Sequence, residues 1–212
     1  MIFSKKSHLV WRVFLISLLF PNLTSAQDAI NMISGTVIYG TITERNDSVL
    51  NYKVAKRKGF KEYAIETDRV FSITKEGNQK SIVYQPEYDF EYSVEEMQRY
   101  VYAGRDAEMY YEGTFSFIAG FSSAAISSYF LYRSDNFFTL VTPLAGLAIG
   151  MHVGPYRAKR GKVRNSSYLN DEAYKAGYKS RLRSIRFSEA VKGAVLGTIV
   201  GVASGYIDRQ SP

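Results

Sequence analysis

The alternation of hydrophobic and polar positions divides this chain into a strand-rich first half and an apolar, helical second half. Between residues 34 and 85, short runs rich in Val, Ile, Tyr, Phe and Thr alternate with turn residues. This pattern is typical of antiparallel strands joined by tight turns. It predicts five strands, at 35–44, 48–55, 61–66, 69–75 and 79–84. Because closure of a small sheet removes its exposed edges, we expect a small, antiparallel, five-stranded β-barrel-like domain.

A helix start follows this domain. We expect residues 86–92 to form a linker, and Ser93 with Glu96 three residues later matches a capping box. The sequence therefore predicts an amphipathic helix that ends near residue 112. The tyrosines at 100, 110 and 111 suit either a membrane interface or packing against the β domain, and both interpretations stay open.

Three apolar segments, at 114–132, 137–154 and 190–207, come next, each near the roughly 20 residues that a helix needs to cross a bilayer. Because lipid tails are as apolar as leucine, membrane helices associate through close contact between small residues. We therefore predict an α+β chain that ends in a bundle of about three glycine-rich transmembrane helices. The expected helix-packing residues recur at four-residue spacing: Gly146, Gly150, Gly154, Gly193, Gly197, Gly201 and Gly205. The alternative is that these segments are buried helices of a soluble core.

Residues 155–189 are strongly basic, and we expect a basic loop with an amphipathic helix there. Such a segment is suited to contact with anionic lipid headgroups. The expected headgroup contacts are Arg157, Lys159, Arg160, Lys162 and Arg164. A charged loop that is simply solvated is the alternative.

Residues 1–26 have a basic start, a short apolar core and small residues before Gln27, which predicts a cleaved signal peptide. Export places the β domain outside the cytoplasm, and a hairpin of two spans returns the basic segment to that same side. Basic loops, however, usually lie in the cytoplasm. A re-entrant hairpin, interrupted at Pro143, or an outer-membrane location would resolve this conflict.

The sequence offers little catalytic chemistry. It has no Cys, and beyond residue 26 its one histidine is His152, which forms neither a triad nor a metal cluster. We expect no enzymatic activity, no cofactor and no metal. The net charge of +7 owes three charges to the signal segment, so we expect no nucleic-acid partner.

Two resemblances add to this picture. Gly40, Ile42, Asp47 and Asn51 nearly follow the opening motif of Sm-like small barrels, with one residue inserted, which implies only a barrel. The whole layout resembles exported, membrane-anchored proteins of Bacteroidetes-type bacteria whose activity is unknown. A V-F-S-I-like strand at 70–73 and a helix motif at Gly104, Asp106 and Ala107 carry that resemblance, with Val101 in place of its tyrosine. It implies an envelope location.

Together these patterns predict six regions: signal peptide 1–26, β domain 34–85, linker and amphipathic helix 86–112, membrane hairpin 113–154, basic segment 155–189 and glycine-zipper helix 190–207. Our first hypothesis is a non-enzymatic protein of a cell-envelope membrane whose β domain is an extracytoplasmic interaction module. Its partners would be membrane lipids and an envelope protein. The second hypothesis is a pore-like or membrane-perturbing homo-oligomer built through the glycine-grooved helices. A membrane-embedded enzyme is a third hypothesis, for which the residues are lacking.

Overall fold

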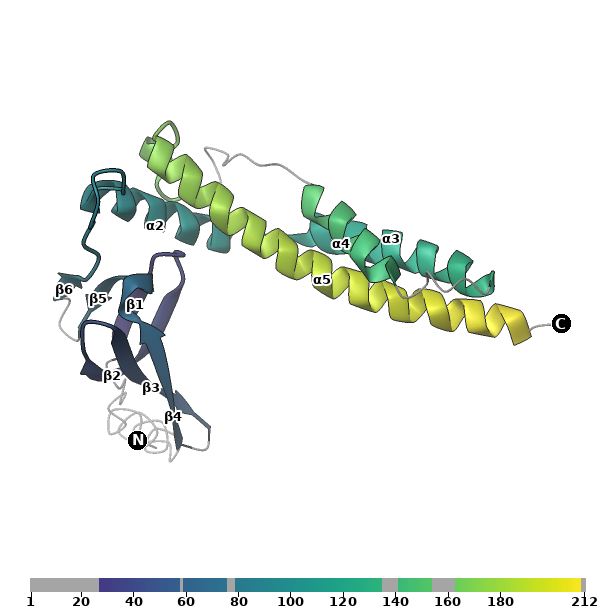
Figure 1. Ribbon diagram of the computed structural model, residues 1–212, viewed down its shortest axis with the longest axis horizontal. Coiled ribbons are helices and arrows are strands. Elements are labelled where there is room, and N and C mark those ends of the chain that lie inside the picture. The colour runs from purple at the N-terminus through teal and green to yellow at the C-terminus, as the bar shows by residue number, and fades with distance from the viewer. Residues whose placement is uncertain (1–26, 58, 76–78, 135–140, 154–162, 211–212) are drawn as a thin grey trace, which may run out of the picture.

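The computed structural model describes residues 27–57, 59–75, 79–134, 141–153 and 163–210. The predicted signal peptide lies outside them. Strands come first and helices follow (Figure 1). The strands are β1 (Asp28–Met32), β2 (Val37–Arg45), β3 (Val49–Lys56), β4 (Gly59–Glu66), β5 (Val70–Thr74) and β6 (Lys80–Ile82). The helices are α2 (Val94–Tyr110), α3 (Thr114–Arg133), α4 (Thr142–His152) and α5 (Glu172–Gln210), with short 3-10 turns at Thr67–Arg69 and Ser166–Tyr168.

The strands form one six-stranded antiparallel sheet in the order β4-β3-β2-β1-β5-β6. The prediction of a barrel-like domain is therefore wrong: β4 and β6 are open edges. The predicted strands correspond to β2 to β6, and β1 is additional. β1 lies between β2 and β5. β6 is only three residues long and, in the described part of the chain, pairs with β5 alone, so the two ends of the sheet do not meet there.

The core of the sheet forms around β1. Ile30 is fully buried and pairs with Ile38 of β2 on one side and with Ile73 of β5 on the other. β2 then changes partner along its length, because its first half pairs with β1 and its second half pairs with β3. The buried cluster is completed by Leu50, Tyr52 and Val70.

Helix α2 connects the sheet to the other helices. Its capping box is confirmed: the Ser93 side chain accepts from the Glu96 backbone, and the Glu96 carboxylate accepts from the Ser93 backbone. The β1–β2 turn rests on the middle of α2, where a Cβ on Gly104 would stand 2.7 Å from the carbonyl oxygen of Ser34. Arg105 reaches back to the sheet and donates a 2.5 Å hydrogen bond to Asn31. The sheet is thus held against α2 by backbone contact and by a polar bridge.

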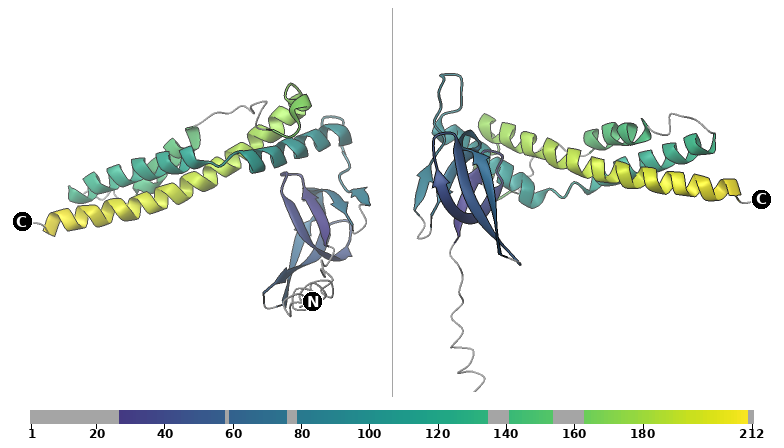
Figure 2. Two further views of the ribbon diagram at one scale, coloured as in Figure 1. Left: turned by 180° about the vertical axis from the view of Figure 1, so that it is seen from behind. Right: turned by 60° about the horizontal axis from the view of Figure 1, so that its bottom comes forward.

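Helix α5 is one continuous helix of 39 residues, and it extends through much of the basic segment expected at 155–189. Its first half lies beside α2, and its second half lies beside α3 and α4, away from the sheet (Figures 1 and 2). Gly193 packs at Phe117 and Gly201 at Ala125, so α3 and α5 run parallel. α4 runs back against both of them and is antiparallel.

Candidate functional site

Helices α3 and α4 and the second half of α5 have their small side chains inside and many of their large apolar side chains outside. The buried residues of α3 are Ser116, Gly120, Ala124 and Ser128. Those of α4 include Gly146 and Gly150. The exposed side chains, which we call the apolar band, are Phe115, Ile118, Ile126, Phe130, Leu144, Ile149, Val195, Leu196, Ile199 and Val200. Water-soluble proteins usually bury such residues, so this arrangement suits an apolar surrounding.

Two described helices, α3 and α5, are long and apolar enough to cross a membrane. Only 22% of the apolar stretch of α3 and 33% of that of α5 is buried, which argues against helices enclosed in a soluble core. α4 has 11 residues and a length of roughly 16 Å, about half the hydrocarbon thickness of a bilayer. Residues 137–140 and 154 of the second predicted membrane segment, 137–154, lie outside the described residues.

The predicted packing glycines of α5 lie where α5 meets α3. A Cβ on Gly193, Gly197 or Gly201 would overlap a backbone carbonyl oxygen of α3. Gly205 is less tightly packed, since its nearest neighbour is the Tyr132 ring, 3.1 Å from the Cβ position. The two backbones can therefore approach only because these positions lack a side chain.

The glycines of α4 pack on both neighbouring helices. A Cβ on Gly146 would meet Ala124 and Ala194, and one on Gly150 would meet Ala190. The α5 glycines therefore pack against α3. The α4 glycines pack against alanines of both α3 and α5. Gly154, the remaining packing glycine of the prediction, is outside the described part of the chain.

Five hydroxyl groups in this layer have hydrogen-bond partners on the helices, whereas the buried Ser116 hydroxyl has none among the described residues. Ser128 and Thr142 share a buried 2.6 Å hydrogen bond between α3 and α4. Ser123, Ser127 and Thr198 each donate to a carbonyl oxygen four residues earlier in their own helix. Hydroxyls bonded in this way need no water, which suits a hydrocarbon surrounding.

Charged groups mark the two ends of the apolar band. At one end, Arg133 of α3 pairs with Asp208 of α5 at 3.3 Å. At the other end, Glu189 and Lys192 of α5 pair at 2.5 Å. Residues 193–207 of α5 carry no charge, and neither do residues 114–132 of α3. We take these two stretches as the segments that suit the interior of a bilayer.

Below the apolar band, α2 and α5 enclose a polar junction around Asp106. This carboxylate is fully buried, and its Oδ2 accepts hydrogen bonds from the Tyr174 hydroxyl at 2.6 Å and from the Asn165 backbone N–H at 3.0 Å. Its Oδ1 has no hydrogen-bond partner among the described residues. Burial, together with the hydrogen bond to Asp106, raises the pKa of Tyr174 above its ordinary value. Burial likewise raises the pKa of Tyr178.

Buried and half-buried cations complete the α2–α5 contact. Arg186 is fully buried and donates from Nε to the Tyr111 hydroxyl at 3.0 Å. Arg181 pairs with Glu108 at 3.1 Å. For Tyr111 the sequence left open a membrane interface or packing on the β domain, and the structure shows a different contact, with Arg186 of α5. This arrangement holds the two helices in one register.

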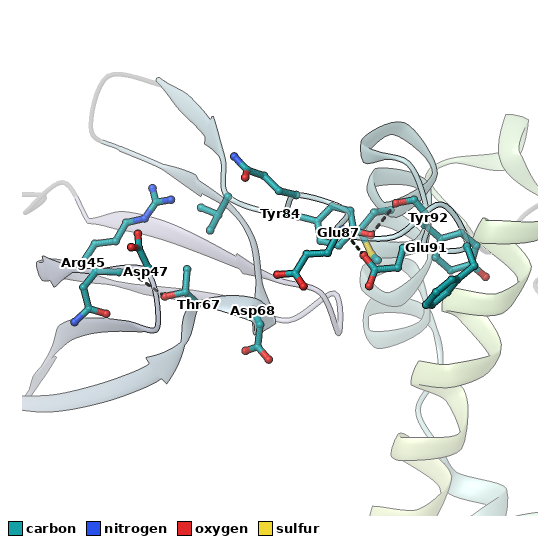
Figure 3. Close-up of a pocket in the computed structure, with 13 residues that line it drawn as sticks. Arg45, Asp47, Thr67, Asp68, Tyr84, Glu87, Glu91 and Tyr92 are labelled. Carbon is teal, nitrogen blue, oxygen red and sulfur yellow. Dashed lines mark hydrogen bonds between the residues drawn. The ribbon is translucent and has the colours of Figure 1, made fainter.

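A groove of about 1100 Å³ lies between the turns at one end of the sheet and the segment that leads into α2 (Figure 3). One arginine and four acids line it: Arg45, Asp47, Asp68, Glu87 and Glu91. None of these four acids forms an ion pair within the described residues. Phe90, which also lines the groove, stacks on Tyr88 at 5.2 Å and is 86% exposed.

Of the predicted headgroup contacts, Arg157, Lys159, Arg160 and Lys162 lie outside the described residues. Arg164 is exposed and precedes Asn165, which bonds to Asp106. No group of three or more His, Cys, Asp or Glu side chains that could hold a metal occurs where the structure is described. The sequence did not predict the polar junction or the groove; the one signal for the junction was Asp106 beside the small residues Ala103, Gly104 and Ala107 of the same helix.

Comparison of the chain with families of proteins, with curated proteins and with solved structures found no match. The apolar band, the polar junction and the groove are the features of this molecule that bear on its function.

Proposed function

We propose that this chain is a non-enzymatic membrane protein of the cell envelope that holds its β domain at the bilayer surface as an interaction module. The observation that supports this most is the inverted packing of α3, α4 and α5, with glycine and alanine inside and the apolar band outside. In a bilayer the exposed side chains contact lipid, and the small residues let the helices pack as a compact three-helix unit. The groove supplies a contact surface, because its unpaired carboxylates and exposed aromatic pair favour a positively charged partner.

The glycine positions favour packing within one chain over the pore-like oligomer. Gly193, Gly197 and Gly201 are already covered by α3, and Gly146 and Gly150 are covered by α3 and α5. An oligomer built through these grooves would have to separate helices that contact each other here.

Membrane fractionation tests the proposal. We expect the full-length protein to stay with membranes after washes with alkaline carbonate and with high salt, alongside inner- and outer-membrane marker proteins. A peripheral protein held by charge would be released by either wash. Complete release would therefore contradict the proposal of an integral membrane protein, whatever the role of the β domain.

The absence of cysteine makes the sidedness directly measurable. Single cysteines introduced as Lys61→Cys on β4 and Gln210→Cys at the end of α5 can be labelled with a membrane-impermeant maleimide. Because α3 and α5 run parallel away from the sheet, we expect the two positions to lie on opposite sides. The extracytoplasmic proposal expects labelling at position 61 before permeabilisation and at position 210 only afterwards. The reverse order would place the β domain in the cytoplasm.

A further inference from the structure

A basic hollow lies between the end of α4 and the first half of α5. Its volume is about 480 Å³, and Met151, His152, Lys179 and Arg183 line it. Lys179 and Arg183 are one helical turn apart on α5, so both side chains project from the same face. Side chains of two different helices therefore line one space, and its volume is within the range of sizes that small-ligand sites occupy.

The two α5 cations at this hollow differ from the other basic residues nearby. Lys175 pairs with Glu172 at 2.8 Å, Arg181 pairs with Glu108, and Arg186 is buried against Tyr111. Lys179 and Arg183 are exposed and form no ion pair within the described stretches of the chain. Between Ala173 and Ser188, α5 has no acidic residue to neutralise them.

His152 is oriented by its own helix. Its Nδ1 lies 2.8 Å from the carbonyl oxygen of Ala148, and since a carbonyl only accepts, Nδ1 is the donor. This hydrogen bond fixes the orientation of the ring and leaves Nε2 as the ring nitrogen that can contact a ligand. A protonated imidazole in this position would donate from Nε2 to an anion while it keeps the bond to Ala148.

The hollow lies just beyond the apolar band. Gly150 packs against Ala190, near the start of the uncharged stretch of α5, and His152 follows two residues later. Arg183 precedes Ala190 by seven residues, which is roughly 10 Å along the helix. Long basic side chains at this level reach toward the headgroup layer of a bilayer.

We infer that His152, Lys179 and Arg183 bind the phosphate group of an anionic phospholipid headgroup. The inference rests on the proposed membrane location and deepens it, since it turns general attraction to a negative surface into one defined site. Arginine can donate two parallel N–H bonds to phosphate oxygens, and lysine adds a compact positive charge. Free phosphate has the same chemistry, and the experiment separates it from lipid.

Native mass spectrometry of the full-length protein, released from micelles with equal amounts of phosphatidylglycerol and phosphatidylcholine, measures the lipid preference. We expect the Lys179→Gln/Arg183→Gln variant to lose about tenfold in preference for phosphatidylglycerol. The matched control is Lys175→Gln/Lys192→Gln, which removes the same charge from the same helix at two residues that are paired with glutamates. The control should keep the preference of the unmodified protein.

Three results would overturn the inference. The first is an unchanged preference in the Lys179/Arg183 variant, and the second is an equal loss in the control. The third is saturable binding of inorganic phosphate to lipid-free protein with no preference for phosphatidylglycerol, which would assign the hollow to a soluble ligand. Each can occur while carbonate washing still leaves the protein in the membrane, so failure of this site is distinguishable from failure of the proposed function.

Discussion

Tyr174 donates a 2.6 Å hydrogen bond to Asp106, and both side chains are buried where α5 passes α2. The same carboxylate oxygen accepts from the backbone of Asn165, so one aspartate joins α2, α5 and the segment before α5. The contact between α2 and α5 thus depends on a polar group as well as on packed side chains.

Removing the Tyr174 hydroxyl should weaken this contact. Tyr174→Phe leaves a buried carboxylate with one donor fewer, and we expect a loss of about 1–3 kcal/mol in the free energy of unfolding. Denaturant unfolding followed by circular dichroism in detergent measures it. Tyr168→Phe is the control, because that ring lies beside Tyr174 but is partly exposed. An equal loss in both variants would assign the effect to the rings and contradict a role for the hydrogen bond.

Alkaline pH should destabilise the protein through the same junction. Burial raises the pKa values of Tyr174 and Tyr178 above the unfolded value of about 10. Their contribution to stability is therefore complete below about pH 10 and is lost as the pH rises above it. Tyrosinate absorbance should show these two ionising together with unfolding. If every tyrosine ionised near pH 10 while the fold stayed intact, Tyr174 and Tyr178 would not be the cause of alkaline destabilisation.

Alanine at the α5 glycines should give a graded result. Gly193→Ala, Gly197→Ala and Gly201→Ala place a methyl group against α3 backbone that cannot move aside, and we expect losses of about 1–3 kcal/mol each. In Gly205→Ala the new Cβ would stand 3.1 Å from the Tyr132 ring and 3.3 Å from the Tyr129 carbonyl oxygen, which are looser contacts, so we expect a smaller loss. Thermal unfolding in one detergent compares all four variants. Equal effects at the four positions would show that the close approach of α3 does not matter.

The contact between the sheet and α2 should be as sensitive to an added methyl group as the contact between α5 and α3. In Gly104→Ala the new Cβ would stand 2.7 Å from the Ser34 carbonyl oxygen, and the β1–β2 turn would have to move. We expect a loss of about 1–3 kcal/mol and faster proteolysis between the sheet and α2. Glu95→Ala, on the exposed side of α2, is the control. Unchanged proteolysis in Gly104→Ala would mean that the turn is not held there.

Local signals in the sequence predicted the local structure. The Ser93–Glu96 capping box, the strand patterns of β2 to β5 and the glycine spacing of α5 all depend on residues a few positions apart. The position of β1 between β2 and β5 depends on pairings across the sheet, which no local pattern encodes. Asp106 and Tyr174 are likewise separated by 68 residues. The groove arises where the sheet turns meet the linker, so its acids looked like ordinary surface residues along the chain.

Because α5 is one continuous helix, it fixes the rotation of its α2-contacting face relative to its α3-contacting face. A helix advances by about 100° per residue, so the direction of Tyr174 beneath α2 determines the direction of Gly193 against α3. One residue inserted between the exposed Phe187 and Ser188 would rotate the two contact faces by about 100° relative to each other. α2 and α3 could then no longer both fit α5, and the orientation of the β sheet relative to α3 would change without any substitution in either contact.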